Sequence, residues 1–487
     1  MKKLISGGNA VFTDRIEKCD ILIDGEKIAA IYKENEYKNT GDCEVIDAKG
    51  LYVMPGTIDP HVHIGLYKPY GEAMKRDTLR QAVGGVTTII NYHRGKGNYF
   101  ETVQRDIDDG EANSTVDFAI SLGLCAKKHL FELEDYVNKL GITSFKFFFD
   151  KQDIAHVFYG IPKEEALTLD KADLYRILVK LKEISPELLL SVHCEDPDMF
   201  RFFEKEVRKT EENSRSLAVF GKTRPSIVET ECVGGALWIN AAVGGNMYIV
   251  HTSAASSVET YRSVTEKFGG KAVLETCPHY LLLDENSPCG LLGKVNPPLR
   301  TKKDAEALWQ GISDGTVKTI GTDNVPVDLS KKYERGEGVF DVYVGFGGAG
   351  IILPTLISEG YHKRGIPLTV LSMVNSTNAA RIFGLKEKGE IKEGFDADFA
   401  IVDLEWERTI TPDLYGDSDF SVYDGMTFKG WPVYTIRRGE IIAKDGKPCA
   451  MGGGKYIRRG GCKKSPDRKK ENNFSNNKST SYFINKK

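Results

Sequence analysis

Short apolar runs rich in valine, isoleucine and phenylalanine recur along the middle of the chain, and longer amphipathic or polar segments separate them. The segments at 174–184, 258–269 and 304–315, for example, space their apolar residues as one face of a helix does. A strand followed by a helix, repeated eight times, predicts an α/β fold with a (β/α)8 TIM barrel over residues 55–385. The eight apolar runs occupy residues 51–59, 86–93, 116–124, 144–150, 187–195, 246–253, 272–280 and 316–324.

A doubly wound open sheet is the competing topology for alternating strands and helices. Such a sheet normally carries a glycine-rich turn after its first strand, where it holds a nucleotide phosphate. The turn after the first run reads GTIDPHVHIG, from Gly56 to Gly65, and carries histidines instead. The pattern therefore favours the barrel.

The two ends of the chain have the pattern of short strands joined by tight turns. The sequence CDILIDGEKIAAI places Asp24 and Gly25 between two alternating apolar runs, which predicts a β-hairpin. Similar patterns return in DADFAIVDLE and VYTIRRGEIIAKDGKP. We therefore expect residues 1–54 and 386–454 to form one small composite β-sandwich domain. Residues 455–487 are basic, then rich in Asn, Ser and Lys, which is typical of a disordered tail.

Composition and charge limit the classes of function. The 487-residue chain has 66 Lys and Arg against 69 Asp and Glu, so no bulk charge points to nucleic acid. Ser6, Gly7 and Gly8 interrupt the apolar start, which argues against a secretion signal, and no run approaches the ~18 apolar residues of a membrane span. The nine cysteines are scattered without a CxxC pair, as in reduced cytoplasmic proteins. We expect a cytoplasmic protein without a membrane or nucleic-acid partner.

Histidine and aspartate side chains occur where the predicted strands end. His61 and His63 lie two residues apart, so on a strand they point the same way. His193 ends the fifth run, His251 lies near the end of the sixth, and Asp323 ends the eighth. Barrel enzymes keep their active sites on the face where these strand ends meet, and zinc favours imidazole and carboxylate ligands. The pattern predicts a metal site.

Lys146 lies within SFKFFFD, the most aromatic of the eight runs. One interpretation is a lysine whose amine reaches solvent from a strand end. The other follows from burial, which lowers the pKa of a lysine and makes its amine nucleophilic. Such an amine can capture carbon dioxide as a carbamate, whose two oxygens suit a bridge between cations about 3.5–4 Å apart.

Together these motifs resemble the amidohydrolase superfamily, and specifically its cyclic amide hydrolases: hydantoinases, dihydropyrimidinases, allantoinases and dihydroorotases. The resemblance runs from about residue 45 to 405. The motifs that carry it are HVH after PG-T-IDP, SFK, SVHCED, VHTSA, LETCPHYL, KVNPPLR, GTDN, and STNAARIFGL with GFDADFAIVD.

The resemblance implies a binuclear hydrolase with two divalent metal ions, zinc first among them, that opens a cyclic amide or ureide ring. His61, His63 and Asp323 would hold the more buried ion, His193 and His251 the second, and the carbamate of Lys146 would bridge both. Asp323 would carry a proton from the attacking hydroxide to the leaving nitrogen. Asn296 resembles a substrate-contacting asparagine of dihydroorotases; alternatively, it shapes the Pro297–Pro298 loop. Relatives are often dimers or tetramers, so a homo-oligomer is expected.

Three positions depart from the relatives and leave the ring unnamed. Dihydroorotases have an arginine where this chain has Gly65. Hydantoinases and dihydropyrimidinases have a tyrosine where Lys151 stands, and Tyr159 is the nearest later tyrosine. Asn324 replaces the usual histidine after the aspartate. We expect a hydantoinase- or dihydropyrimidinase-like enzyme. An allantoinase- or dihydroorotase-type cyclic amidase, a catalytically silent assembly protein and a mononuclear deaminase remain the alternatives.

Overall fold

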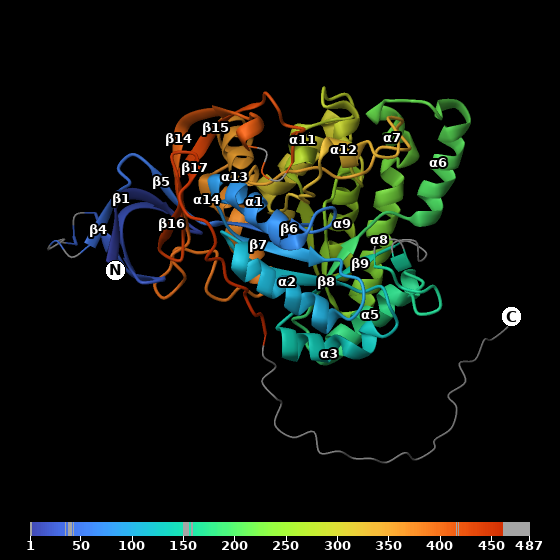
Figure 1. The fold of residues 1–487 in the computed structure, drawn as a ribbon, viewed down its shortest axis with the longest axis horizontal. Coiled ribbons are helices and arrows are strands. Elements are labelled where there is room, and N and C mark those ends of the chain that lie inside the picture. Colours follow the sequence, from blue (N-terminus) through green and yellow to red (C-terminus); the bar gives the residue numbers. More distant parts are fainter. Residues whose placement is uncertain are drawn as a thin grey trace, which may run out of the picture.

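The computed structural model describes residues 2–34, 36–37, 41, 43–149, 155–156, 159–414, 416 and 418–460 (Figure 1). The chain forms an eight-stranded parallel sheet from its middle and a nine-stranded mixed sheet from its two ends. Figure 1 shows the nine-stranded sheet at one end of the molecule and the helices around the eight-stranded sheet at the other. Within the described ranges no helix combines the length and the apolar character needed to cross a membrane.

The eight-stranded sheet confirms the predicted barrel. Its strands follow one another in chain order from β6 to β13. The backbone N–H of His63 donates to the carbonyl of Asn324 at 2.8 Å, and a parallel bridge joins Val62 to Asn324, so the first and last strands nearly close the barrel. The strands are β6 (Thr57–Val62), β7 (Val86–His93), β8 (Asp117–Gly123), β9 (Ser144–Phe148), β10 (Leu189–His193), β11 (Asn246–Ile249), β12 (Lys271–Thr276) and β13 (Val317–Ile320).

Helices follow most of the barrel strands, and their apolar spacing decides which face is buried. In α5, Leu174, Ile177, Leu178 and Leu181 are buried on one face, and the side chain of Asp170 caps the first turn. The helices along the barrel are α1 (Tyr70–Val83), α2 (Tyr99–Asn113), α3 (His129–Leu140), α5 (Lys171–Ile184), α6 (Pro197–Glu211), α7 (Leu217–Thr223), α8 (Ser226–Val243), α9 (Ala255–Phe268), α10 (Pro278–Leu282), α11 (Lys302–Asp314) and α12 (Leu329–Lys332). Shorter elements are η1 (Gly290–Gly293), α13 (Ile352–Thr355), η2 (Leu356–His362), α14 (Leu368–Ser372), η3 (Met373–Thr377), α15 (Asn378–Phe383) and η4 (Pro412–Leu414).

The nine-stranded sheet combines both ends of the chain, as the strand patterns predict. Its order is β17-β16-β15-β14-β5-β1-β2-β3, with β4 paired parallel to β1. Antiparallel pairing of β5 with β14 joins the N-terminal to the C-terminal segment, and β2 with β3 forms the predicted hairpin. The strands are β1 (Lys2–Val11), β2 (Ile16–Asp24), β3 (Lys27–Lys33), β4 (Cys43–Asp47), β5 (Tyr52–Pro55), β14 (Phe399–Thr409), β15 (Thr427–Arg437), β16 (Glu440–Lys444) and β17 (Lys447–Pro448).

The two sheets meet at a buried ionic cluster at the start of β8. The Lys388 amine donates to Asp117 at 2.8 Å and to Asp398 at 2.6 Å, and it lies 3.0 Å from Asp396. Arg438 adds a bond to Asp117 at 3.0 Å. Lys27 lies 2.7 Å from Asp396, so three cations face the three carboxylates. The cluster is therefore an ion-pair network rather than a metal site.

The first residues of the predicted disordered tail are ordered, which corrects the prediction for 455–460. Tyr456 forms a parallel bridge with Phe118, and the backbone N–H of Ile457 donates to the carbonyl of Phe118 at 2.7 Å. Arg459 is buried and donates to the Ser144 hydroxyl at 3.0 Å and to the Ile120 carbonyl. This segment therefore packs against β8 and β9 of the barrel. Residues 461–487 lie outside the described part of the chain.

Candidate metal centre

The side chains predicted to bind metal meet at the carboxyl ends of the barrel strands. His61 lies in β6, Lys146 in β9 and His193 at the end of β10. His63, His251 and Asp323 lie one, two and three residues beyond the ends of β6, β11 and β13. All six are therefore placed by the parallel strand order, although they are spread over more than 250 residues of chain.

One group consists of His61, His63 and Asp323. A carboxylate oxygen of Asp323 lies 3.0 Å from Nε2 of His63 and 3.4 Å from Nε2 of His61. One donor atom from each residue lies within 4.8 Å of the other two, the spacing of ligands around one ion. His61 is fully buried, and its Nε2 has no hydrogen-bond partner. The three donors fit a divalent metal such as zinc.

A second group, His193 and His251, adjoins the first. Nδ1 of His193 lies 2.8 Å from Nε2 of His251. The imidazole rings of His61 and His251 stack with their centres 5.6 Å apart, so both groups belong to one cluster. Burial, followed by the neighbouring charges of His193 and Lys146, lowers the pKa of His251, which keeps its imidazole neutral and able to bind a metal.

Lys146 faces this cluster with an amine that has no hydrogen-bond partner. The residue is 1% exposed, and its Nζ lies 5.1 Å from the centre of the Tyr92 ring and 5.3 Å from that of Phe148. Burial lowers the pKa of Lys146 from 10.5 to about 7, although the charges of Asp323 and Glu275 oppose this shift. An unpartnered cation here would cost free energy, so the site favours a neutral, nucleophilic amine.

Two carboxylates bond the outer nitrogens of two of these histidines. Oε1 of Glu275 lies 2.8 Å from Nδ1 of His61, and Oε2 of Glu195 lies 3.0 Å from Nε2 of His193. Each bond leaves the other nitrogen of the imidazole facing the cluster. Burial alone would raise the pKa of Glu195, but the charge of Arg224 and the bond from His193 hold it below its ordinary value. Neither glutamate was predicted from the sequence. The available signal was a glutamate within the apolar run 272–280, because a buried carboxylate needs partners.

The turns that carry His251 and Asp323 are held in a backbone conformation rare for residues other than glycine. Their φ angles are +41° and +50°. Beside Asp323, the N–H of Thr322 donates to Asp59 at 3.0 Å, and the amide of Asn324 donates to Asp77 at 2.7 Å. Asn324 therefore helps to fix this turn. Strained turns held in this way are common at functional sites.

A cavity of about 940 Å³ opens onto the cluster and is lined by His63, Lys146, His193, His251 and Asp323. Asn296 also lines it, and its buried Oδ1 has no hydrogen-bond partner. Tyr159 is buried and belongs to the wall of neither this cavity nor the smaller one beside it, and Lys151 lies outside the described residues.

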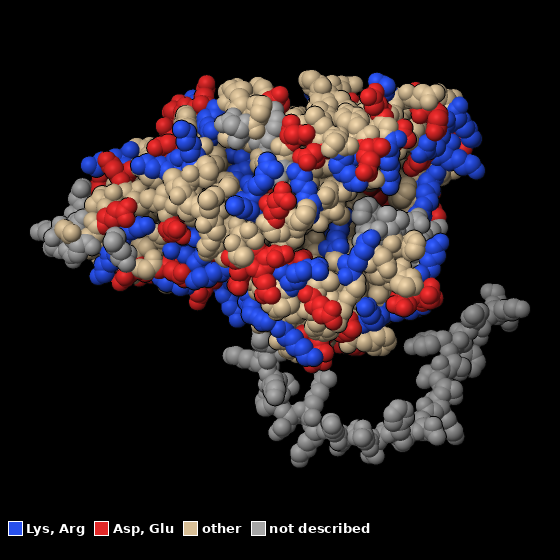
Figure 2. Space-filling view, viewed as in Figure 1, with Lys and Arg blue, Asp and Glu red and all other residues tan. Residues whose placement is uncertain are grey.

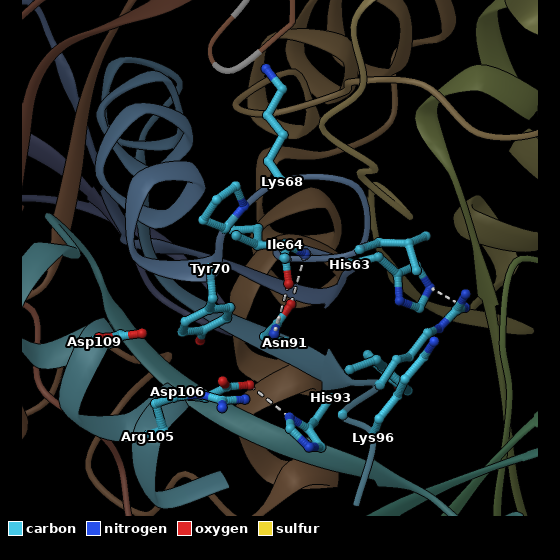
Figure 3. Close-up of a pocket in the computed structure, with 16 residues that line it drawn as sticks. His63, Ile64, Lys68, Tyr70, Asn91, His93, Lys96, Arg105, Asp106 and Asp109 are labelled. Atoms are coloured by element: carbon cyan, nitrogen blue, oxygen red, sulfur yellow. Dashed lines mark hydrogen bonds and ion pairs between the residues drawn. The ribbon is translucent and has the colours of Figure 1, made fainter. Parts of the chain in front are cut away.

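The smaller cavity, of about 420 Å³, lies beside His63 and is drawn in Figure 3. Nδ1 of His93 lies 2.6 Å from a carboxylate oxygen of Asp106, a contact drawn as a dashed line. His63, Leu66 and Arg94 line both cavities, so they form the boundary between the two.

Comparison with known proteins agrees with this geometry. The chain matches the model of the amidohydrolase family over residues 52–442. It is 33% identical to a D-hydantoinase of Geobacillus stearothermophilus over 94% of this chain and 97% of that protein. It is 31% identical to an allantoinase of Rubrobacter xylanophilus over 93% of this chain and 97% of that protein.

Solved structures extend the similarity to the whole fold. A D-hydantoinase structure matches with a TM-score of 0.84 and 30% identity, over 94% of this chain and 99% of that one. The dihydropyrimidinase of Brevibacillus agri matches with a TM-score of 0.83 and 30% identity over the same shares. With its barrel, its composite sheet and its histidine–aspartate cluster, the chain belongs to the amidohydrolase family, in the branch of cyclic amidohydrolases that hydrolyse carbon–nitrogen bonds.

Proposed function

We propose that this protein is a binuclear metal-dependent hydrolase that opens a cyclic amide or ureide ring, in the manner of hydantoinases and dihydropyrimidinases. The observation that carries the proposal is the buried, unpartnered amine of Lys146 beside two groups of histidine ligands. A single metal site would need His61, His63 and Asp323 alone. A second ion would explain both the presence of His193 and His251 and the neutral amine of Lys146.

We assign the residues to two ions, with zinc proposed because it favours imidazole and carboxylate ligands. His61, His63 and Asp323 would hold one ion, and His193 and His251 the other. The Lys146 nitrogen would attack carbon dioxide, form a nitrogen–carbon bond and release a proton, which leaves an anionic carbamate as the shared ligand. Glu275 and Glu195 would keep His61 and His193 in the orientation that binding requires.

Two zinc ions bound here would supply hydroxide at neutral pH and polarise the amide carbonyl. Asp323 would accept the proton of the nucleophile and deliver it to the ring nitrogen as the carbon–nitrogen bond breaks. The unpartnered Oδ1 of Asn296 would accept a hydrogen bond from a ring N–H and so orient the substrate. The buried position of the cluster at the base of the cavity would limit competing water.

A second candidate is an allantoinase-type activity on a ureide ring. The sequence similarity favours it, because the chain is 31% identical to the Rubrobacter allantoinase and 33% identical to the Geobacillus D-hydantoinase. A dihydroorotase-type activity has less support, because Gly65 carries no side chain to contact a substrate carboxylate. We also propose a cytoplasmic homo-oligomer, a dimer or tetramer.

The experiment is a measurement of zinc content together with turnover of hydantoin, dihydrouracil, allantoin and dihydroorotate by the zinc-loaded full chain. We expect two zinc ions per chain and ring opening without release of ammonia. One ion with ammonia release would instead indicate a deaminase. Protein that binds no zinc under these conditions would indicate a silent relative, and either result would overturn the proposal.

A further inference from the structure

Asp59 of β6 is a buried acid to which the proposed function gives no role. Figure 2 shows acidic and basic residues intermixed over the surface, whereas Asp59 is 0% exposed. Among the described residues no basic side chain pairs with it, and hydrogen bonds alone stabilise it. It lines neither of the two cavities, so it does not contact the substrate. A carboxylate is costly to bury without a cation, so this position needs an explanation.

Four hydrogen bonds reach this carboxylate from three parts of the barrel. Its Oδ1 accepts the backbone N–H groups of Thr322 at 3.0 Å and of His61 at 3.3 Å. Its Oδ2 accepts the Thr322 hydroxyl at 2.5 Å and the side-chain amide of Gln81 at 3.2 Å. The strand of the first histidine pair, helix α1 and the turn after β13 therefore meet at one side chain.

Each of the four partners presents a hydrogen to Asp59. The oxygen of the Gln81 amide accepts the N–H of Gly350 at 3.0 Å, which turns its NH2 group toward Asp59. The Thr322 hydroxyl accepts the N–H of Asn324 at 3.2 Å, which leaves its hydrogen for Asp59. The other two partners are backbone N–H groups, which can only donate. A carboxylate accepts all four hydrogens, and an amide of the same size does not.

These bonds hold the residue directly before Asp323, and other bonds hold the residue directly after it. The side-chain amide of Asn324 donates to Asp77 at 2.7 Å, and its side-chain oxygen accepts the N–H of Gly348 at 2.7 Å. The carbonyl of Asn324 accepts the N–H of His63 at 2.8 Å. Asp323 itself has a φ of +50°, and a residue keeps such a conformation only where its surroundings hold it.

The same turn lies directly against His61. A Cβ atom added at Gly321 would lie 2.8 Å from Cβ of His61 and 2.7 Å from Oε2 of Glu275, so no side chain fits there. The carboxylate of Asp323 lies 3.4 Å from Nε2 of His61 across this contact. A small shift of the turn therefore moves the Asp323 carboxylate relative to the histidines.

We propose that Asp59 is a positioning residue for ring opening, which acts through Thr322 to place the carboxylate of Asp323. The inference rests on the proposed function, in which Asp323 holds one ion and carries the proton. A proton carrier must lie within hydrogen-bond reach of the reacting atoms, and a displacement of about 1 Å can cost on the order of 100-fold in rate.

The experiment compares Asp59→Asn and Thr322→Val with the native zinc-loaded full chain, on whichever of the four rings the native protein opens fastest. Asparagine replaces one acceptor oxygen with an NH2 donor, and valine removes the hydroxyl that donates to Asp59. We expect kcat to fall at least about tenfold with KM nearly unchanged. The solvent deuterium isotope effect on kcat should rise, because proton transfer by a misplaced Asp323 becomes slower. Thr322→Ser keeps the hydroxyl and should lose less activity than Thr322→Val.

Asp173→Asn is the matched control, because it also replaces a buried carboxylate that accepts hydrogen bonds. Asp173 of α5 is 1% exposed, accepts the N–H of Leu169 at 3.0 Å and pairs with Arg176 at 2.9 Å, and it lines neither cavity. This variant should lose stability yet keep the native kcat and isotope effect per folded molecule. A native isotope effect in both Asp59→Asn and Thr322→Val would overturn the inference. If Asp59→Asn does not fold, Thr322→Val decides alone.

Zinc affinity separates this inference from the proposed function. If the native protein opens none of the four rings, the proposed function is in doubt, and competition with a chelator decides the role of Asp59. Zinc bound at least about tenfold more weakly by Asp59→Asn and Thr322→Val than by the native chain and Asp173→Asn supports the inference, because Asp323 is one of the ligands. Equal zinc binding by all four proteins overturns it.

Discussion

Glu275 accepts a hydrogen bond from Nδ1 of His61 at 2.8 Å, and this contact leaves Nε2 of the imidazole facing Asp323 in the candidate metal centre. The same carboxylate oxygen accepts the backbone N–H of His251 at 2.9 Å, and the other oxygen accepts the Tyr248 hydroxyl at 2.7 Å. One buried side chain thus contacts one residue from each of the two histidine groups. We interpret Glu275 as the positioning residue that fixes the two groups relative to each other.

Replacing Glu275 with glutamine should therefore weaken zinc binding. The amide keeps the size of the side chain but replaces one acceptor oxygen with an NH2 donor. One of the three groups that donate to Glu275, from His61, His251 and Tyr248, therefore loses its acceptor. We expect zinc affinity to fall by about 10- to 100-fold, as measured by competition with a chelator. Glu266→Gln, at an exposed position of α9, is the control. Unchanged affinity in Glu275→Gln would show that its hydrogen bonds serve stability alone.

Replacing Lys146 with alanine should abolish binding of the metal pair, and activity with it, because the shared anionic ligand is lost. A short carboxylate such as propionate should restore part of the activity, since the vacated volume next to Tyr92 and Phe148 can admit an anion. The measurement is zinc content and ring opening with and without propionate, with circular dichroism to confirm folding. If the variant keeps both ions and full activity unaided, Lys146 does not bridge them.

The pKa of Lys146 also predicts how metal loading depends on pH. Burial lowers this pKa to about 7, so the amine is neutral and able to attack carbon dioxide above that pH, and protonated and inert below it. In bicarbonate, zinc uptake by the metal-free protein should therefore rise with pH around a midpoint near 7. An ordinary lysine would give a midpoint near 10.5. Uptake that is as complete well below pH 7, or that does not depend on bicarbonate, would contradict carbamate formation.

The barrel could be predicted from the sequence because parallel strands covered on both faces read as continuous apolar runs. The run 51–59 shows the limit of this reasoning. It is shared between the two sheets, with Tyr52–Pro55 in β5 and Thr57–Val62 opening the barrel as β6. Both strands are almost entirely buried, and only long-range pairing, β5 with β14 and β6 with β7, decides where one ends.

The metal-site candidates could be predicted because strand ends of a parallel barrel share one face, which turns positions in sequence into neighbours in space. The remaining site features depend on which elements pack together. Arg94 follows a strand, where a charged residue usually meets solvent, and its place beside His63 depends on the loop after β6. Arg459 lies in a segment whose composition is typical of disorder, yet it is buried against β8 and β9, since these strands supply its acceptors.

Lys388 offers a test of what joins the two sheets. Its amine contacts Asp117 of β8 and Asp398 just before β14, and these contacts raise its pKa despite burial. Lys388→Met would leave buried carboxylates without this cation, so we expect unfolding free energy to fall by about 3–5 kcal/mol in urea denaturation at neutral pH. The loss should shrink in acid, where the carboxylates become protonated and no longer need a partner. Lys392→Met, at an exposed position nearby in sequence, should change stability by less than about 0.5 kcal/mol. If the two variants were equally stable, Arg438 alone would suffice to balance the cluster, and the joint between barrel and composite sheet would depend on apolar packing instead.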